Sequence, residues 1–421
     1  MAESNIQSTV EAVWRMESAK IIAKLARMLR DVGLAEELAQ DALVTALEQW
    51  PASGVPNNPG AWLMVTAKNR ALDQLRRFKL LQRKHQTIAN DAELLSTPPS
   101  PEEESDDEVG DDLLRLMFIA CHPVLSTEAR VALTLRLLGG LNTAEIARAF
   151  LVPEPTIAQR IVRAKRALTE AHVPFDMPRA EELANRLASV LEVIYLIFNE
   201  GYAATAGEEW MRPALCEEAL RLGRILAELA PREPEVHGLI ALMEIQASRA
   251  RARVGPAGQP ILLLEQDRAR WDQLLIRRGL AALERADALS GTLGPYALQA
   301  AVAACHARAR SANETDWVRI VALYDALAQL APSPVVDLNR AVAVSMAFGP
   351  GAGLEIVDEL NTDSRLSTYH LLPSVRGDLL EKLGRFDEAR TEFTRAAALA
   401  RNARERTLLL GRAASCGGTP Q

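Results

Sequence analysis

Basic and amide side chains share one face of a helix that the sequence predicts from about residue 155 to 168. Its apolar residues recur at helical spacing, at Ile157, Ile161, Ala164 and Leu168. The polar residues between them include Thr156, Gln159, Arg160, Arg163, Lys165 and Arg166. Arginine and glutamine form paired hydrogen bonds with guanine and adenine edges in a DNA major groove, while basic side chains also neutralise phosphates. We therefore predict base and phosphate contacts for Gln159, Arg160 and Arg163. For Lys165 and Arg166 we predict phosphate contacts.

A shorter helix before this one supports a DNA-binding interpretation. Residues 142–145 have the pattern of a helix start, with a carboxylate in the first turn. Ile146, Ala147 and Phe150 are expected to face inward, and residues 151–153 to form a turn. Two short helices joined by a tight turn, with a basic outer face on the second, are typical of a helix-turn-helix. The alternative, a basic face that only meets solvent, is disfavoured because both helices have an inward period.

A second set of polar side chains lies on a helix predicted from residue 61 to about 79 and in the Pro-, Gly- and Asn-rich loop 51–60 before it. The candidate residues are Asn57, Asn58, Trp62, Asn69, Asp73, Arg76 and Arg77. Val65, Leu72 and Leu75 are expected on the inner side of the helix. An unstacked base needs a stacking surface and amide partners, and a single strand needs cations. The pattern therefore fits melted DNA; the alternative is a surface helix with an Asp73–Arg76 ion pair.

Charge is segregated along the chain, although the net charge is −7. Seven basic residues lie between Lys68 and Lys84 against one acid, whereas ten acids and no base lie between Asp91 and Asp112. A phosphate backbone responds to the local patch, because exposed charges are screened within roughly 8 Å. The acidic stretch also contains Pro and Ser and cannot bury an apolar face, so it is predicted to be a flexible linker.

The residues that usually mark catalysis, metal binding or secretion do not form recognisable patterns. The six histidines stand singly, and the four cysteines are widely spaced, so we expect reduced cysteines, mostly in the core, and no metal. No HExxH, GxSxG or phosphate-binding glycine-rich loop occurs, so we expect no enzyme and no cofactor. Without a run of eighteen apolar residues or a cleavable signal, the chain is expected to be cytoplasmic and to have no membrane contact. The dominance of Ala, Leu, Arg and Glu predicts an all-α fold.

Three blocks of the sequence together resemble a known family. They are residues 35–44, with Glu37, Gln40 and Asp41, residues 61–77, and residues 145–168. In this order they resemble the two conserved domains of extracytoplasmic-function (ECF) sigma factors, which belong to the sigma-70 family of RNA polymerase sigma factors. The resemblance covers residues 1 to about 175. It implies a region 2 domain at 1–90, an acidic linker at 91–112, and a region 4 helix-turn-helix domain at 113–175.

The resemblance also implies partners and residue roles. Glu37, Gln40 and Asp41 match the surface for the β′ clamp helices of core RNA polymerase, and the β flap is a further expected contact. The 51–60 loop and the helix after it match the part that opens and recognises the −10 promoter element, and the helix around Arg160 matches the one that recognises the −35 element. The acidic linker would thread the polymerase cleft. The alternatives are solvated helix faces and a simple tether.

The C-terminal half resembles the extension of a subgroup of these sigma factors. Gly377, Gly384 and Phe393 fit a tetratricopeptide (TPR) repeat. Two similar units precede it in the sequence, at offsets of 33 and 36 residues. The resemblance implies a helical domain at 176–290 and a short solenoid of TPR-like repeats at 291–412. Its surface is expected to bind the chain's own sigma domains or a protein partner.

These observations favour a sigma factor that directs core RNA polymerase to promoters and is regulated in cis by its extension. An alternative is a one-component regulator in which a TPR-like sensor controls a helix-turn-helix that binds an operator without polymerase. A repeat scaffold without any DNA role is a third alternative, but it leaves the basic residues from Arg160 to Arg166 unexplained.

Overall fold

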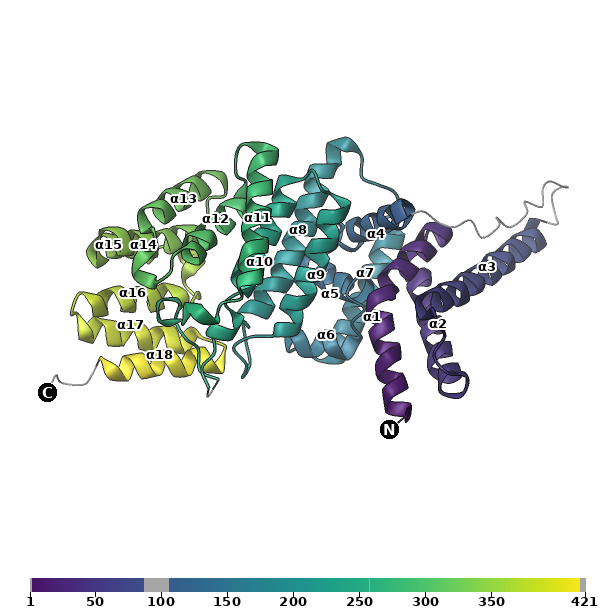
Figure 1. The fold of residues 1–421 in the computed structure, drawn as a ribbon, viewed down its shortest axis with the longest axis horizontal. Helices are drawn as coiled ribbons and strands as arrows, with labels where there is room; N and C mark the ends of the chain where they lie inside the picture. The colour runs from purple at the N-terminus through teal and green to yellow at the C-terminus, as the bar shows by residue number, and fades with distance from the viewer. Residues whose placement is uncertain (1, 87–105, 257, 417–421) are drawn as a thin grey trace. The chain divides into compact units, whose positions relative to one another are not determined.

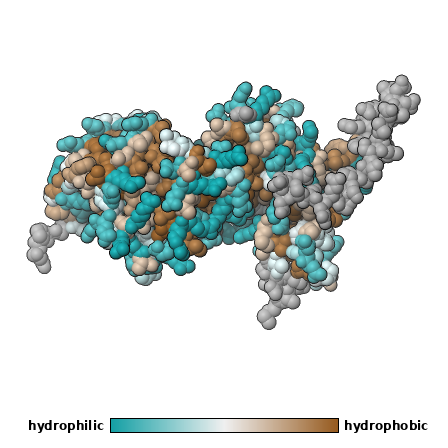
Figure 2. Space-filling model, turned by 45° about the horizontal axis from the view of Figure 1, so that its top comes forward, coloured by the Kyte–Doolittle hydropathy of each residue, from teal (hydrophilic) through white to brown (hydrophobic). Residues whose placement is uncertain are grey.

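The structure is a computed structural model that describes residues 2–86, 106–256 and 258–416. Within these residues it has eighteen α-helices, five short 3-10 helices and no β-strand, so the predicted all-α class is confirmed. The described residues form two compact units, within 1–194 and 195–421 (Figure 1). Hydrophilic and hydrophobic residues are interspersed over the face in Figure 2. None of the described helices is long and apolar enough to cross a membrane.

The first three helices pack together around small side chains. They are α1 (Ala2–Leu29), α2 (Val32–Ser53) and α3 (Pro59–Gln86). The inner row of α3 is Leu63, Ala67 and Ala71, which are fully buried, whereas Val65 is 57% exposed. The inward placement predicted for Val65 is therefore wrong. The residues of α3 that face inward at helical spacing include two alanines, and these small side chains allow α3 to approach α1 and α2 closely.

The loop between α2 and α3 is shorter than the predicted span of residues 51–60. Helix α2 continues through Pro51 and ends at Gly54, whose φ of +81° is favoured by glycine and whose N–H donates to the Trp50 carbonyl at 2.9 Å. Helix α3 begins at Pro59, where a missing N–H costs no helical bond. The Asn58 side chain accepts a hydrogen bond from the Ala61 N–H at 3.0 Å and caps α3.

The predicted linker ends earlier than residue 112. Residues 91–105 lie outside the described part of the chain, but residues 106–112 form the start of α4 (Asp106–Ala120). The helical extension of α4 includes a buried carboxylate. Asp112 pairs with Arg115 at 2.8 Å and with Arg27 of α1 at 3.2 Å. Burial raises the pKa of Asp112, and the two arginines oppose that shift.

The helix-turn-helix forms where the sequence predicts it. After α5 (Thr127–Leu137), helices α6 (Thr143–Phe150) and α7 (Glu154–Glu170) follow. Asn142 and Glu145 form a reciprocal capping box at the start of α6. Leu151 makes the turn in a left-handed conformation, with φ of +51°. The buried residues of α7 are Ile157, Ile161, Ala164 and Leu168, as predicted.

The second unit is a series of helices in which consecutive members pack against each other. Helix α8 (Ala180–Tyr202) runs from the first unit into the second, and 3-10 helices η1 (Ala250–Ala252), η2 (Leu263–Glu265) and η3 (Arg268–Arg270) lie between α10 and α11. The other α-helices are α9 (Pro213–Leu229), α10 (Pro234–Ala247), α11 (Gln273–Ser290), α12 (Pro295–Arg308), α13 (Trp317–Leu330), α14 (Pro334–Phe348), α15 (Pro350–Leu360), α16 (Leu371–Lys382), α17 (Phe386–Leu399) and α18 (Ala403–Ser415).

Glycine at two positions allows neighbouring helices of this unit to approach closely. A Cβ at Gly353 of α15 would lie 2.7 Å from the Ala341 carbonyl of α14, and one at Gly377 of α16 would lie 2.9 Å from the Phe393 ring of α17. Small residues at these sites suit stacked helix pairs. The assignment of the pairs as TPR-like repeats stays a prediction, as do the ranges of the region 2, region 4, helical and repeat domains.

Inside the first unit, one buried carboxylate joins the N-terminal three-helix part to the helix-turn-helix part. Glu36 of α2 is 3% exposed. It accepts a hydrogen bond from Arg136 Nε of α5 at 2.7 Å, pairs with the Lys165 ammonium of α7, and accepts from the Gln40 amide. Arg15 of α1 also pairs with Glu145 of α6 at 2.6 Å. Burial lowers the pKa of both Arg136 and Lys165, and the nearby charges of Glu145 and Asp31, respectively, oppose that shift.

The substitution Glu36→Gln should destabilise the first unit by about 3 kcal/mol, because it leaves two partly buried cations without their counterion. Urea unfolding would measure the loss, and hydrogen exchange at α2 and α7 amides would locate it. Glu37→Gln, one residue away and exposed, is the matched control and should change stability by less than about 0.5 kcal/mol. Equal stabilities of the two variants would contradict a structural role of Glu36.

Candidate nucleic-acid and polymerase interface

Four of the six residues predicted to recognise the −35 element line one groove. Thr156, Gln159, Arg160 and Arg163 of α7 face the start of α5, where Ser126 and Glu128 form the other wall. Hydrogen bonding to its own backbone N–H is the largest cause that lowers the pKa of Glu128, followed by Ser126 and, at longer range, Arg160. The groove therefore carries two guanidiniums and one ionised carboxylate. Its cations lie directly outside the buried row of α7, which holds their helix in place.

The other two predicted residues of α7 lie away from this groove. Arg166 is exposed and pairs with Glu170 of its own helix at 2.6 Å. Lys165 instead points to α2 and pairs with Glu36, so in this arrangement it does not share a DNA-facing surface with Arg163. The reason is the position of Lys165 around the helix axis. It follows buried Ala164 and precedes buried Leu168 by three residues, so its side chain points toward the inner side of α7.

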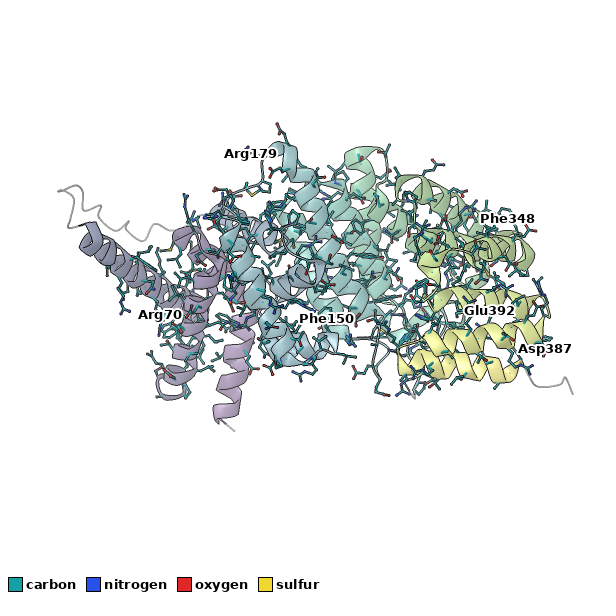
Figure 3. All side chains as sticks on the ribbon, turned by 180° about the vertical axis from the view of Figure 1, so that it is seen from behind. Arg70, Phe150, Arg179, Phe348, Asp387 and Glu392 are labelled. Carbon is teal, nitrogen blue, oxygen red and sulfur yellow. The ribbon has the colours of Figure 1, made fainter. Side chains whose placement is uncertain are left out.

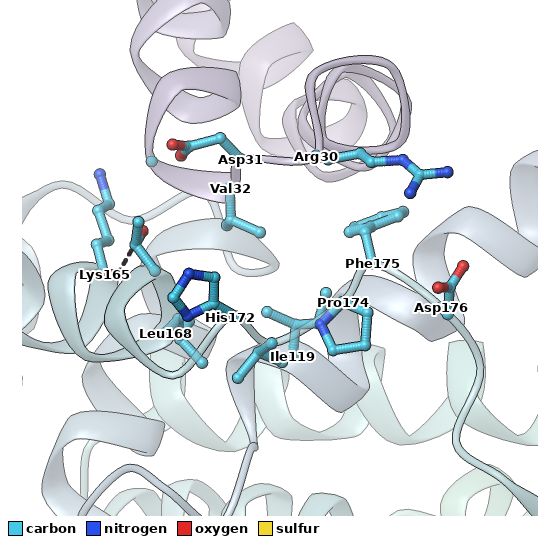
Figure 4. A pocket seen from close by; sticks show the side chains of 13 residues that line it. Arg30, Asp31, Val32, Ile119, Lys165, Leu168, His172, Pro174, Phe175 and Asp176 are labelled. Atoms are coloured by element: carbon cyan, nitrogen blue, oxygen red, sulfur yellow. Dashed lines mark hydrogen bonds between the residues drawn. The ribbon is translucent and has the colours of Figure 1, made fainter.

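A crevice between the start of α2 and the end of α7 lies beside the Lys165 contact (Figure 4). Asp31 caps α2 by accepting from the Leu34 N–H at 3.0 Å, and His172 and Phe175 form the opposite wall. Among the described residues no group of three histidine, cysteine or acidic side chains could hold a metal ion. The crevice marks the seam where α2 meets α7.

The residues predicted to face the β′ clamp helices do not all lie on open surface. Glu37 is exposed, and Asp41 is exposed and pairs with Arg70 of α3 at 3.3 Å (Arg70 is labelled in Figure 3). Gln40 instead lines a pocket with Arg136 and Glu145 and donates to Glu36. One of the three predicted residues of this surface, Gln40, thus lies half-buried in a pocket and not on open surface.

The residues predicted for the −10 element form a stripe on the outer side of α3. Asn57 and Asn58 lie in the exposed loop, and Asn69, Asp73, Arg76 and Arg77 are exposed along the helix. Trp62 is half-buried and meets the ring of buried Trp50 edge to face, with centroids 5.4 Å apart. Asp73 and Arg76 form an exposed ion pair at 3.2 Å. The stripe combines amides, cations and one anchored aromatic side chain, which are groups that can hold single-stranded DNA.

Sequence reasoning missed the residues that join the two parts of the first unit. Glu36 interrupts the apolar inner face of α2 next to buried Ala35, and this interruption is the signal that could have revealed it. Arg136 and Arg15 carried no such signal, because their partners lie 100 and 130 residues away in the chain.

Three family profiles match consecutive parts of the chain. Sigma-70 region 2 matches residues 14–79, sigma-70 region 4 matches residues 115–168, and a family of unknown function, DUF6596, matches residues 186–287. The first two matches contain the α2–α3 surfaces and the helix-turn-helix described above. The third lies at the end of the first unit and in the first half of the second.

Several known proteins are similar to this chain. The uncharacterized protein R00370 of Rhizobium meliloti is 46% identical over 386 residues, which is 90% of this chain and 89% of that protein. The probable ECF RNA polymerase sigma factor SigI of Mycobacterium tuberculosis is 28% identical over 41% of this chain and 58% of its own length. The ECF RNA polymerase sigma factor SigL of the same species is 29% identical over 36% of this chain and 82% of its own length.

The long match to the Rhizobium protein covers both units, while the sigma factor matches cover the N-terminal part. The two sigma-70 regions and the similarity to ECF sigma factors support a sigma factor's role in transcription initiation, with core RNA polymerase and promoter DNA as partners. The protein belongs to the same family as R00370 and is a sigma-70 family factor of the ECF type.

Proposed function

We propose that α7 recognises the −35 element through Gln159, Arg160 and Arg163, while the 51–60 segment and α3 open and recognise the −10 element. Glu37, Gln40 and Asp41 of α2 bind the β′ clamp helices. The observation that carries this assignment is the polarity of α7: an exposed basic and amide face lies over a fully apolar inner row. Only the exposed face can approach base edges, since the inner row packs against α5 and α6.

Arg160→Ala and Arg163→Ala should weaken use of the −35 element, because each removes a side chain able to bond a base edge. Loss of a base contact is worth about 1–3 kcal/mol, or roughly 5- to 150-fold in binding. Run-off transcription with core polymerase on −35 variant promoters measures it. Arg166→Ala should weaken all promoters alike and reduce the salt dependence.

The exposed Arg179, outside α7, provides the charge-matched control, and Arg179→Ala should leave promoter use unchanged. If the Arg160 and Arg163 variants lose affinity equally on all −35 sequences, these arginines contact phosphates only. Tight duplex binding without polymerase, and no polymerase-dependent start, would favour a one-component regulator instead.

The promoter is longer than the unit that would recognise it. The −35 and −10 elements are about 25 base pairs apart, which is roughly 80 Å of duplex at about 3.4 Å per base pair. A compact unit of this length has a radius of gyration of about 16 Å. We propose that the Glu36 contacts hold a closed form of the first unit, and that α7 leaves α2 when polymerase and promoter bind. Separation would also uncover Gln40 for polymerase.

A disulfide between α2 and α7 should block this separation. A Cβ at Gly33 would lie 4.0 Å from the Lys165 Cβ, which is within the range for a disulfide. The oxidised Gly33→Cys, Lys165→Cys variant should lose at least 90% of run-off transcription, and dithiothreitol should restore it. The reduced variant is the control, and the four native cysteines are buried. Full activity of the oxidised, cross-linked form would rule out an obligatory opening.

We also propose that the C-terminal unit regulates the sigma regions in cis. It presents large exposed apolar side chains, among them Phe348 at 62% and Phe386 at 53% (Phe348 is labelled in Figure 3). Apolar side chains on a surface of stacked helix pairs favour docking onto another protein surface. The candidate surfaces are the chain's own sigma regions, a protein partner or polymerase.

Truncation after Ile194 should change transcription by at least threefold, or change the choice among promoters, if the C-terminal unit regulates the sigma regions. This end point keeps the contacts of α8 with the first unit: Arg186 donates to the Phe118 carbonyl at 2.6 Å, and Glu192 pairs with Arg130 at 3.0 Å. Run-off transcription with equal amounts of folded protein, checked by circular dichroism, gives the measurement. Equal activity and equal promoter choice over a range of salt and polymerase concentrations would reject regulation in cis.

A further inference from the structure

Three arginines of the second unit gather around three aromatic rings. The Arg253 guanidinium carbon lies 3.5 Å from the centroid of the Tyr202 ring and 5.5 Å from that of Trp210. Arg249 lies 5.7 Å from the Tyr202 centroid and 5.8 Å from that of Trp271, and Arg268 lies 5.1 Å from the Trp271 centroid. The rings thus link three cations that come from the segment between α10 and α11. We call these six residues the arginine–aromatic cluster.

The cluster is buried at one end and open at the other. Arg253 and Trp271 are 7% and 3% exposed, whereas Arg249 and Arg268 are half-buried. Burial is the main cause that lowers the pKa of Arg253, and the nearby Arg249 lowers it further. Burial, followed by the charge of Arg249, likewise lowers the pKa of Arg268. An arginine nevertheless keeps its proton in proteins, so three positive charges repel one another here.

Among the residues that the structure describes, no carboxylate neutralises these charges at contact distance. Within the described part of the chain, none of the three arginines forms an ion pair. They donate only to neutral acceptors: the carbonyls of Tyr202, His306 and Ala309, the hydroxyls of Tyr202 and Thr315, and the Gln246 amide oxygen. Glu405 and Glu314 act on Arg253 and Arg268 from a longer distance.

Other partly buried arginines in the same unit are neutralised directly. Arg212 pairs with Glu200, and Arg224 lies 2.9 Å from Glu244. Buried charge without a counterion is costly, because the surrounding protein replaces water poorly. The arginine–aromatic cluster is therefore an exception that the rest of the unit avoids.

Three further polar groups at the cluster have no hydrogen-bond partner in the described structure. They are the buried indole nitrogens of Trp210 and Trp271 and Nδ1 of His306. Burial, with the charges of Arg249 and Arg268, lowers the pKa of His306 to about 4, so its imidazole is neutral near pH 7. An indole nitrogen can only donate, so both tryptophans carry a donor for which the described residues supply no acceptor.

We propose that the arginine–aromatic cluster binds a phosphate group of a small ligand. Three guanidiniums lie close to the rings of two tryptophans whose indole donors are unpartnered, and this excess of charge and donors suits the three oxygens and up to two negative charges of a phosphate better than a singly charged carboxylate. All six residues lie within residues 186–287, the part that matches the family of unknown function. The proposal gives this domain a ligand class, and it does not rest on the proposed promoter recognition.

Calorimetric titration of the full chain with inorganic phosphate tests the proposal, with chloride and acetate at equal ionic strength as comparison ions. Phosphate should bind, and it should raise the unfolding temperature more than either comparison ion does. Equal effects of phosphate, acetate and chloride would overturn the proposal whatever the variants show.

Arg249→Gln and Arg268→Gln should each weaken phosphate binding at least tenfold. Both side chains are half-buried at the open end, so the fold tolerates their loss better than that of Arg253. The matched control is Arg251→Gln, an exposed arginine of the same segment, which should bind phosphate like the unchanged chain. Without phosphate, the Arg249 and Arg268 variants should unfold at the same or a higher temperature, because like charges are removed. Unchanged phosphate affinity in both variants would also overturn the proposal.

Discussion

The buried Glu36 carboxylate is the interaction on which the arrangement of the first unit depends. It brings a lysine of α7, an arginine of α5 and an amide of its own helix to one point, where the carboxylate is buried and its partners are partly buried. A buried anion with two cations keeps its position only if all partners stay, because the loss of any one leaves an uncompensated charge. The contact therefore stabilises the arrangement only while all of its members are in place, and the loss of one member removes most of that stabilisation. This property would suit the proposed opening, in which α7 leaves α2.

The Glu36 contact also determines which basic side chains of this acidic chain are free to form a basic surface. Arg136 and Lys165 lose part of their effect on a phosphate backbone while Glu36 neutralises them. Arg160 and Arg163 stay on the open side of α7. Separation of α7 from α2 would release Lys165 from its partner, and it would then return to the set of phosphate-binding candidates. Under the proposed opening, the predicted phosphate contact of Lys165 and its observed ion pair with Glu36 would belong to two states of the same helix.

The sequence predicts those features that depend on local period and capping. The buried row of α7 and the capping box at Asn142 follow from residues within one or two helical turns, so both are confirmed. The inner face of α3 was misplaced because alanines, which carry a weak hydrophobic signal, occupy it in preference to the larger Val65. The Glu36–Lys165 pair spans 129 residues, and no local pattern can show which distant cation will meet a carboxylate. Promoter recognition by the individual residues stays a prediction.

Charge compensation distinguishes the two units in a way that bears on their roles. In the first unit a buried carboxylate receives its cations from the chain itself, so the closed arrangement is complete without any other molecule. In the arginine–aromatic cluster the described residues supply cations and unpartnered donors but no carboxylate at contact distance, which is the basis of the proposed phosphate site. A ligand that binds there lowers the free energy of the ordered segment between α10 and α11 relative to its open states. If the second unit binds a small anion in this way, its stability would depend on that anion, and such a dependence is what a sensor domain needs.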